Sequence, residues 1–251
     1  MTGQDLSGHV AVVTGARRGI GAAIAAVLLD HGATVVTGGR DGALLARQAE
    51  ELGERGRVIP CAADLRTATG RTRLLEAAGR VDILVNNAGG FTRASTTRDT
   101  TPGDWQQQLE INLTIPFLLC QSVLPGMIER GWGRILNIGS VVASAPQLGN
   151  AIGYVAAKSG LVGFTRQLAA EVAGLGVTAN VLNPGTVKTE HLDEYFAASD
   201  TVSEQTLSAA IPVGRLGRPD EIAAIVPYLV SDASGFLTGS VIDINGGAIH
   251  A

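Results

Sequence analysis

The 251-residue sequence has little of several residue types, and each shortage argues against a class of protein. Its two cysteines, Cys61 and Cys120, fit no metal-ligand spacing and form no disulfide framework, which favours a reducing cytoplasm. The four histidines are scattered along the chain, so we expect no metal centre. The sequence has no apolar run of about 18 residues and no basic and apolar leader, which predicts no membrane span and no secretory signal.

Charge of either sign is also scarce. Charged residues make up 17% of the chain, and the formal net charge is −4. This balance gives no electrostatic reason to bind nucleic acid or an anionic membrane. Hydrophobic residues make up 45%, which is enough to bury a sizeable core. We therefore expect a folded cytoplasmic protein without a nucleic-acid or membrane partner.

Short apolar segments alternate with helical patterns along the sequence. Strands are predicted at residues 9–15, 33–39, 57–65, 81–90, 133–140, 176–185 and 240–247. Helices are predicted at residues 19–32, 41–53, 67–79, 101–130, 153–174 and 219–231. Alternation of this kind, with strands that are apolar nearly throughout, indicates a parallel sheet with helices on both faces. Because no linker divides the chain, we predict a single α/β domain over residues 1–251, a Rossmann-type doubly wound sheet of about seven parallel strands.

The turn after the first predicted strand reads TGARRGIG, with Gly15, Gly19 and Gly21. Glycine allows positive φ and leaves no Cβ between the backbone and a ligand. A turn of this kind is a usual phosphate site, because free N–H groups at a helix start attract anions. Arg17 and Arg18 oppose the dipole of that helix, which is tolerable if a dianion occupies the site. The alternative is an ordinary strand-to-helix turn, which the flanking pattern disfavours.

The end of the second predicted strand bears on which dinucleotide the turn would hold. Dinucleotide folds usually carry an acid there for the ribose 2′-hydroxyl, but this sequence has Gly38, Gly39 and Arg40. Asp41 follows one residue too late. Arg18 and Arg40 would attract a 2′-phosphate, so the sequence favours NADP(H) over NAD(H). The alternative is that both arginines are solvated surface residues.

Tyr154 and Lys158, in the segment YVAAK, share one face of a predicted helix. A nearby ammonium favours the phenolate, so we expect Lys158 to lower the pKa of Tyr154 and make it an acid–base catalyst. Such a pair alone is a weak signal. Ser140 strengthens it, because it ends a predicted strand where its hydroxyl could bind a substrate oxygen. Asn112 is a polar residue in an amphipathic helix, and it could instead be a satisfied amide that kinks or fixes that helix.

With these motifs in this order, the sequence resembles a short-chain dehydrogenase/reductase over essentially its whole length. The matching motifs are TGARRGIG at 14–21, Asp64, NNAG at 86–89, Asn112, Ser140, Tyr154 with Lys158, NPGTVKT at 183–189, PVGRLGRPDEIA at 212–223 and INGG at 244–247. The resemblance implies that Tyr154 is the general acid or base and that Ser140 stabilises the reacting oxygen. It also implies that Lys158 binds the nicotinamide ribose and that Asn112 holds a water in a proton relay.

The resemblance extends to a dinucleotide site. The cofactor residues that it implies are Gly15, Arg17, Arg18, Gly19, Ile20, Gly21, Arg40, Asp64, Leu65, Asn87, Ala88, Gly89, Tyr154, Lys158, Pro184, Gly185, Val187 and Thr189. Asp64 would contact adenine, and the turn after residue 184 would meet the carboxamide and the pyrophosphate.

Two segments are expected to shape the substrate pocket. The interval from Ser140 to Tyr154 is one residue longer than is common in the family, which suggests Gln147 and Leu148 as pocket residues. Residues 189–212 lack strong periodicity and correspond to a mobile substrate lid, in which His191 is a third candidate. Asp193 and Glu194 in this lid could repel an anionic substrate, although solvated side chains are the preferred interpretation.

The resulting hypothesis is an NADP(H)-dependent oxidoreductase that moves hydride between nicotinamide and a carbonyl or secondary alcohol. One case is a 3-oxoacyl reductase, whose substrate can be linked to a carrier protein. The alternatives are a sugar, steroid or xenobiotic alcohol dehydrogenase of the same family and, from another class, a non-catalytic dinucleotide-sensing regulator. The regulator is disfavoured because both Tyr154 and Lys158 are present. The resemblance further implies a homotetramer, and Arg130 resembles a residue that docks carrier proteins but could simply cap its helix.

Overall fold

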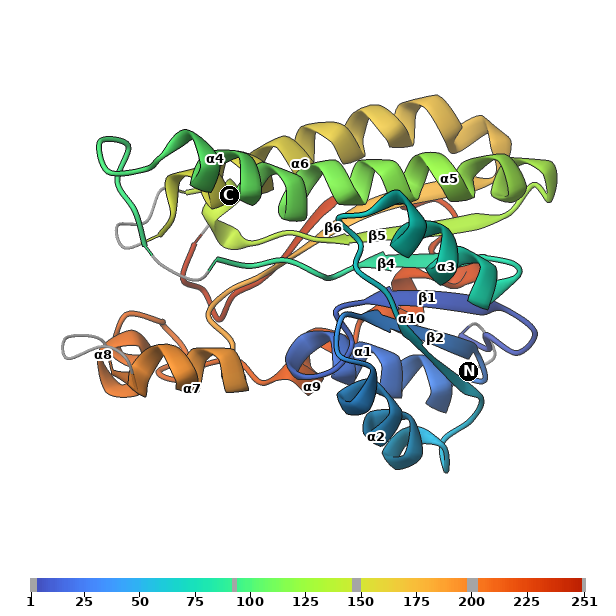
Figure 1. Cartoon of the computed structure of the whole chain (residues 1–251), viewed down its shortest axis with the longest axis horizontal. Coiled ribbons are helices and arrows are strands. Elements are labelled where there is room, and N and C mark those ends of the chain that lie inside the picture. The colour runs from blue at the N-terminus through green and yellow to red at the C-terminus, as the bar shows by residue number, and fades with distance from the viewer. Residues whose placement is uncertain (1–3, 92–93, 146–149, 198–202, 250–251) are drawn as a thin grey trace.

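The computed structural model describes residues 4–91, 94–145, 150–197 and 203–249. Seven parallel strands form one sheet in the order β3-β2-β1-β4-β5-β6-β7 (Figure 1). Their bounds are β1 Val10–Thr14, β2 Thr34–Gly39, β3 Val58–Ala62, β4 Ile83–Asn86, β5 Gly133–Ile138, β6 Val177–Pro184 and β7 Val241–Ile244. The predicted seven-stranded parallel sheet is therefore confirmed.

Helices cover both faces of the sheet, as the apolar strands predicted (Figure 1). One face carries α1 Gly19–Asp30, α2 Gly42–Leu52, α9 Pro219–Ala223 and α10 Val226–Leu229. The other face carries α3 Ala68–Ala78, α4 Pro102–Leu109, α5 Ile115–Glu129 and α6 Ile152–Val172. Two further helices, α7 Glu190–Ala197 and α8 Glu204–Ala209, lie beyond the sheet.

The two apolar clusters of the core follow from the pleat of the strands. Ala11 and Val13 of β1 belong to the cluster under α1, whereas Val12 points into the cluster under α3 and α5. All three side chains have no exposed surface. Since successive residues of a strand face opposite sides, a central strand covered twice must be apolar throughout.

Three predicted elements differ from the structure. The single helix expected at residues 219–231 is split into α9 and α10, because Pro227 has no N–H with which to continue the ladder. The long helix expected at residues 101–130 contains a π-helical turn, Glu110–Thr114, between α4 and α5. The lid region, in which no periodicity was found, contains the two short helices α7 and α8.

The expectation that no segment could span a membrane needs correction. The continuous helix Pro102–Glu129 contains an 18-residue stretch of mean hydropathy 1.6, long and apolar enough by length and composition alone. One helix of this kind is weak evidence for a membrane. In this fold α4 packs on α6 and α5 on β5.

The strand order also locates the region where a ligand would bind. The chain runs outward through β2 and β3 on one side of β1 and through β4 to β7 on the other. In open parallel sheets, ligands bind beyond the carboxyl ends of the strands where this order reverses. Here the reversal lies between β1 and β4.

Candidate active site

The carboxyl ends of six strands carry the residues that the sequence analysis selected. Thr14 ends β1, Arg40 follows β2, Asp64 lies two residues beyond β3, and Asn87 follows β4. Ser140 lies two residues beyond β5, and the 183–189 turn ends β6. Because all strands are parallel, these residues lie along the same edge of the sheet. The topology therefore gathers segments that are far apart in the sequence.

The glycine turn has the conformation that its glycines predict. Gly15 has φ +66° and Gly19 has φ +58°, in the left-handed region that favours glycine. A Cβ on Gly21 would lie 2.5 Å from the carbonyl oxygen of Gly15 and would strike the amide nitrogen of Asn87. Ile20 is half-buried against the core under α1. The turn is thus packed too tightly for side chains at these positions.

Asn87 and Thr14 hold the turn against β4. The Asn87 side-chain amide donates to the carbonyl oxygens of Thr14 at 2.9 Å and Gly15 at 3.1 Å. The hydroxyl of Thr14 accepts from the backbone N–H groups of Asn87 at 3.0 Å and Ala88 at 2.9 Å. Gln48, buried on α2, donates its side-chain amide to the carbonyl of Ala16. Sequence reasoning missed Gln48, since a glutamine in a helix gives no signal of its distant partner.

The start of α1 fits an anionic group such as a dinucleotide phosphate. Arg18 is the N-cap residue, and no side-chain cap hydrogen bond is made there. The first N–H groups of the helix and its positive dipole end therefore remain available to an anion. Arg17 is exposed, whereas Arg18 is half-buried and forms an ion pair with Glu194 of α7.

A second charged group lies beyond β2 and β3. The guanidinium of Arg66 donates to both oxygens of Asp64, at 2.9 Å from Nε and 2.6 Å from Nη2, and lowers the pKa of that carboxyl to about 2. Arg40 is exposed and adds a smaller Coulomb contribution to the same shift. Leu65 is buried. Arg66, which the sequence analysis did not select, is thus the main partner of the residue expected to face adenine.

Ser140, Tyr154 and Lys158 converge beside β5. The Ser140 hydroxyl hydrogen-bonds to the Tyr154 side chain. The ammonium of Lys158 lies 5.7 Å from the centroid of the Tyr154 ring and donates to the carbonyl of Ile138 at 2.6 Å. Ser140 is also held through its backbone N–H, which donates to Oδ1 of Asn183 at 3.0 Å.

The electrostatics of this cluster correct one expectation. Burial raises the pKa of Tyr154, and the hydrogen bond from Ser140 opposes this shift without cancelling it. The expected lowering of that pKa by Lys158 is wrong for this structure, because the ammonium binds the Ile138 carbonyl instead of the phenol oxygen. Lys158 is only 4% exposed, and desolvation lowers its own pKa to about 8. Tyr154 is therefore held as a neutral phenol.

Asn112 lies at the centre of the π-helical turn and is fully buried. Its amide nitrogen donates to Gly90 at 3.2 Å and to the backbone oxygen of Gln108 at 3.0 Å, and its Oδ1 accepts from the Gly90 N–H at 2.8 Å. A Cβ on Gly89 would lie 2.5 Å from Asn112 Oδ1 and 3.5 Å from Lys158 Nζ. The interpretation of Asn112 as a satisfied amide that fixes its helix thus agrees with these contacts. π turns of this kind are frequent at functional sites.

The turn that ends β6 packs between the glycine turn and the last strand. Pro184 ends β6, and Gly185 donates its N–H to Ile244 of β7 at 2.9 Å. Val187 is buried and bridges to Gly217. Thr189 accepts from the N–H of Leu192 at 3.3 Å and so caps α7.

The family of the chain follows from comparison with known proteins. The family described as short chain dehydrogenase matches residues 9–200. The chain belongs to the short-chain dehydrogenase family.

Relatives of this short-chain dehydrogenase match over nearly full length. A 3-oxoacyl-(acyl-carrier-protein) reductase FabG from Vibrio harveyi is 39% identical over 245 residues, 97% of this chain and 98% of that one. An acetoacetyl-CoA reductase from Shinella zoogloeoides is 41% identical over 241 residues, 95% and 98% of the two chains.

Two solved structures share the fold. The Pseudomonas aeruginosa RhlG/NADP active-site complex has 35% identity and a TM-score of 0.89, covering 98% of both chains. A 3-oxoacyl-(acyl-carrier protein) reductase from Brucella melitensis with bound NAD has 32% identity and a TM-score of 0.87, covering 99% and 94%. The protein is thus an oxidoreductase of C=O or CH–OH groups.

The substrate side of this short-chain dehydrogenase includes an aromatic residue beside Tyr154. Gln147 and Leu148 lie outside the described residues, as does the side chain of His191. Phe91, which sequence reasoning missed, packs on the Tyr154 ring with centroids 5.1 Å apart. It lies two residues beyond the NNAG motif, which was the signal that could have pointed to it.

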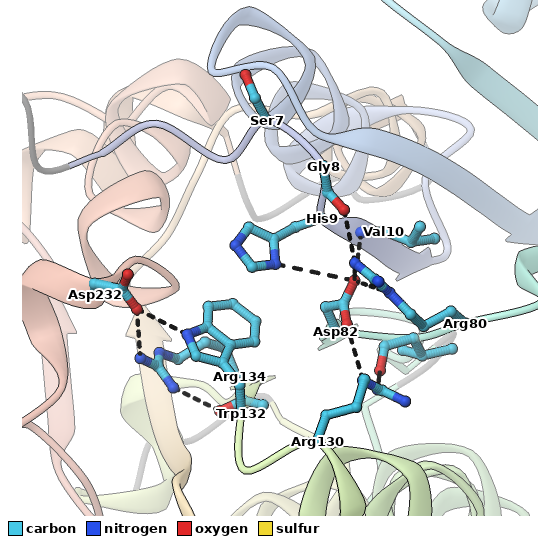
Figure 2. A network of polar contacts seen from close by, with 12 residues as sticks. Ser7, Gly8, His9, Val10, Arg80, Asp82, Arg130, Trp132, Arg134 and Asp232 are labelled. Atoms are coloured by element: carbon cyan, nitrogen blue, oxygen red, sulfur yellow. Dashed lines mark hydrogen bonds and ion pairs between the residues drawn. The ribbon is translucent and has the colours of Figure 1, made fainter.

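Arg130 lies at the opposite edge of the sheet from the candidate site. Its Nε is 3.3 Å from Asp82 Oδ1, and its Nη2 donates to the carbonyl of Val81 at 2.7 Å. Figure 2 shows Asp82 between Arg80 and Arg130, with His9 close by. His9 precedes β1, Arg80 and Asp82 precede β4, and Arg130 precedes β5, so these residues lie at the amino ends of the strands. Arg130 is the C-cap residue of α5, and its side chain ties that helix end to Val81 and Asp82 before β4.

Proposed function

We propose that this short-chain dehydrogenase is an NADP(H)-dependent reductase of 3-oxoacyl thioesters, with Tyr154 as the proton donor. The observation that carries the proposal is the cluster of Ser140, Tyr154 and Lys158 at the carboxyl edge of the sheet. A phenol of raised pKa keeps its proton at neutral pH and suits the role of an acid toward a carbonyl.

The cofactor half of the proposal rests on the glycine turn and its arginines. The backbone N–H groups at the start of α1 would hold the pyrophosphate, with Arg18 and Arg40 toward a 2′-phosphate. Asp41, the acid nearest the end of β2, accepts from the Leu44 N–H at 3.1 Å and caps α2. Its carboxylate is thus engaged by the helix start, which supports NADP(H) over NAD(H).

In the proposed reduction the protein supplies position and a proton. The reduced nicotinamide, when bound, supplies a hydride to the carbonyl carbon. The Tyr154 hydroxyl gives its proton to the carbonyl oxygen, so that a ketone, a hydride and a proton yield a secondary alcohol. The Ser140 hydroxyl donates a hydrogen bond to the same oxygen as its negative charge develops. Lys158 would bind the nicotinamide ribose and return a proton to Tyr154, with Asn112 in the relay.

The substrate class is inferred from the two curated relatives, one named for a carrier-protein substrate and the other for a coenzyme A substrate. Both names specify a 3-oxoacyl group on a thioester, and this shared group is what we assign. Residues 189–212, with α7 and α8, would form the lid that closes over it.

An assay of substrates tests the proposal directly. Acetoacetyl-CoA with NADPH or NADH should give oxidation of NADPH, followed by absorbance, and a panel of sugar, steroid and simple ketones should react more slowly. Tyr154→Phe should reduce the rate by about a hundredfold to ten-thousandfold while NADPH still binds. Tyr228→Phe, in a partly exposed tyrosine on α10, is the matched control. A Tyr154→Phe protein of full activity would refute the assigned role.

We also propose a cytoplasmic homotetramer. Trp105 on α4 and Phe117 on α5 are 37% and 42% exposed. Phe117 packs edge-on against Phe164 of α6, with centroids 5.8 Å apart, so an apolar surface extends across both helices. Exposed aromatic side chains on neighbouring helices are typical of subunit contacts.

A further inference from the structure

An ion pair joins the glycine turn to a helix 176 residues further along the chain. Arg18 donates from both terminal nitrogens to the two carboxylate oxygens of Glu194 on α7, with Nη2 3.0 Å from Oε2. The Arg18 side chain is 28% exposed and that of Glu194 is 60% exposed. This contact is the main cause that raises the pKa of Arg18, and Glu190 adds a smaller Coulomb contribution.

The residue that caps α7, Thr189, also packs against the glycine turn. A Cβ on Gly19 would lie 3.2 Å from Cγ2 of Thr189, the residue that caps α7. Glu194 then reaches Arg18 from about one helical turn further along α7. The lid helix is therefore attached to the glycine turn at two points, one by packing and one by charge.

The proposed cofactor needs the same guanidinium. A carboxylate and a phosphate monoester both bind the planar fork of an arginine through two parallel N–H···O bonds. Glu194 accepts one N–H from each terminal nitrogen of Arg18. A 2′-phosphate that binds this same pair of N–H groups has to displace the carboxylate. NAD(H) has a 2′-hydroxyl in that place and no charge with which to compete.

We propose that Glu194 is a specificity-determining residue, whose carboxylate occupies Arg18 until a 2′-phosphate displaces it and so releases α7. The inference rests on the proposed function, because it requires a dinucleotide at the glycine turn. Linkage makes the effect reciprocal: if the 2′-phosphate loosens α7, then loosening α7 must strengthen binding of the 2′-phosphate by the same factor. Glu194 thus lowers the affinity for NADP(H) and couples its arrival to the position of the lid.

The size of the effect follows from the exposure of the pair. Exposed ion pairs contribute little to the free energy of a fold. The bidentate geometry places the Arg18–Glu194 pair at the upper end of the range for exposed pairs. Removing the competing Arg18–Glu194 pair should lower the apparent dissociation constant of a ligand with a 2′-phosphate by about threefold to sixfold. The gain should shrink as salt is added, because both the pair and the phosphate contact are screened.

Calorimetry with two small probes isolates the 2′-phosphate. The probes are 2′,5′-ADP, which carries that phosphate, and ADP, which lacks it, each titrated into the full-length protein. Glu194→Gln should tighten 2′,5′-ADP by about threefold to sixfold and leave ADP unchanged. The matched control is Asp193→Asn, which removes an equal charge from the neighbouring exposed position of α7. An equal gain in this control would assign the effect to general charge and overturn the inference.

Hydrogen exchange measured by mass spectrometry gives a readout that is independent of affinity. Adding 2′,5′-ADP should speed exchange of the amides of residues 190–197, and ADP should not. In Glu194→Gln these amides should exchange faster before any ligand is added. If Glu194→Gln changes neither the exchange of these amides nor the ratio of the affinities for 2′,5′-ADP and ADP, the role of Glu194 is refuted and the proposed function is untouched. A protein that binds neither probe and does not bind NADPH refutes the proposed function as well.

Discussion

Replacing Lys158 by methionine should abolish activity and yet stabilise the fold. Desolvation lowers the pKa of this buried ammonium from 10.5 to about 8. At about 1.4 kcal/mol for each pH unit, holding the charge inside the folded protein costs about 3 kcal/mol at neutral pH. Methionine has a similar shape and no charge, but it leaves the Ile138 carbonyl without its 2.6 Å hydrogen bond, at a cost of about 1 kcal/mol. The net gain should be about 2 kcal/mol.

The pH dependence separates this explanation from ordinary repacking. Below pH 8 the lysine is protonated in both the folded and the unfolded chain, so the whole penalty is present. As pH rises from about 8 to 10.5 the unfolded chain binds more protons than the folded one, so the wild-type protein gains stability. At about pH 9.5 roughly half of the penalty remains, and the advantage of the variant should be close to zero.

Equilibrium unfolding in urea at one fixed protein concentration measures the difference between the two proteins. The melting temperature of Lys158→Met should be higher by about 4 to 8 °C at neutral pH. Lys188→Met is the matched control, because it changes the other lysine of the chain, which is half exposed and paired with Glu204 at 2.6 Å. That variant should gain no stability. A Lys158→Met protein that is less stable than wild type at neutral pH, or whose advantage is the same at both pH values, would refute the reasoning.

Two further predictions concern the cofactor and the proton. Replacing both Arg18 and Arg40 by methionine should weaken NADPH binding by about a hundredfold and leave NADH binding nearly unchanged, as measured by calorimetry; an equal loss for both would contradict the 2′-phosphate assignment. Because the pKa of Tyr154 is raised, carbonyl reduction should stay level with rising pH until beyond the range in which an ordinary tyrosine ionises, whereas alcohol oxidation, which needs the phenolate, should increase throughout that range. Initial rates in both directions check this, and oxidation that is fastest near neutral pH would contradict it.

The sequence predicts those features of this protein that depend on neighbouring residues. The alternation of strands and helices is a local pattern, and the glycine turn is a local motif, so both were predictable. The break at Pro227 was also visible in the sequence, but it was overlooked within an otherwise periodic helix. The raised pKa of Tyr154 was not predictable, because it depends on how deeply the fold buries the ring and on which oxygen Lys158 reaches. The partners of Asp64 and Arg18 likewise depend on side-chain positions that spacing does not encode.

The two arginines of the glycine turn illustrate how a local conflict can mark a functional position. A cation at the positive end of a helix is unfavourable, and α1 has no acidic residue in its first turn to offset it. Arg17 relieves the conflict by exposure to water, whereas Arg18 is half-buried and does so through Glu194. An anion from outside the helix is therefore required at Arg18, and a carboxylate of the lid and a phosphate of the cofactor both meet that requirement. Only one of these two anions can bind the pair of N–H groups that Glu194 now uses, so Arg18 responds to which anion is present.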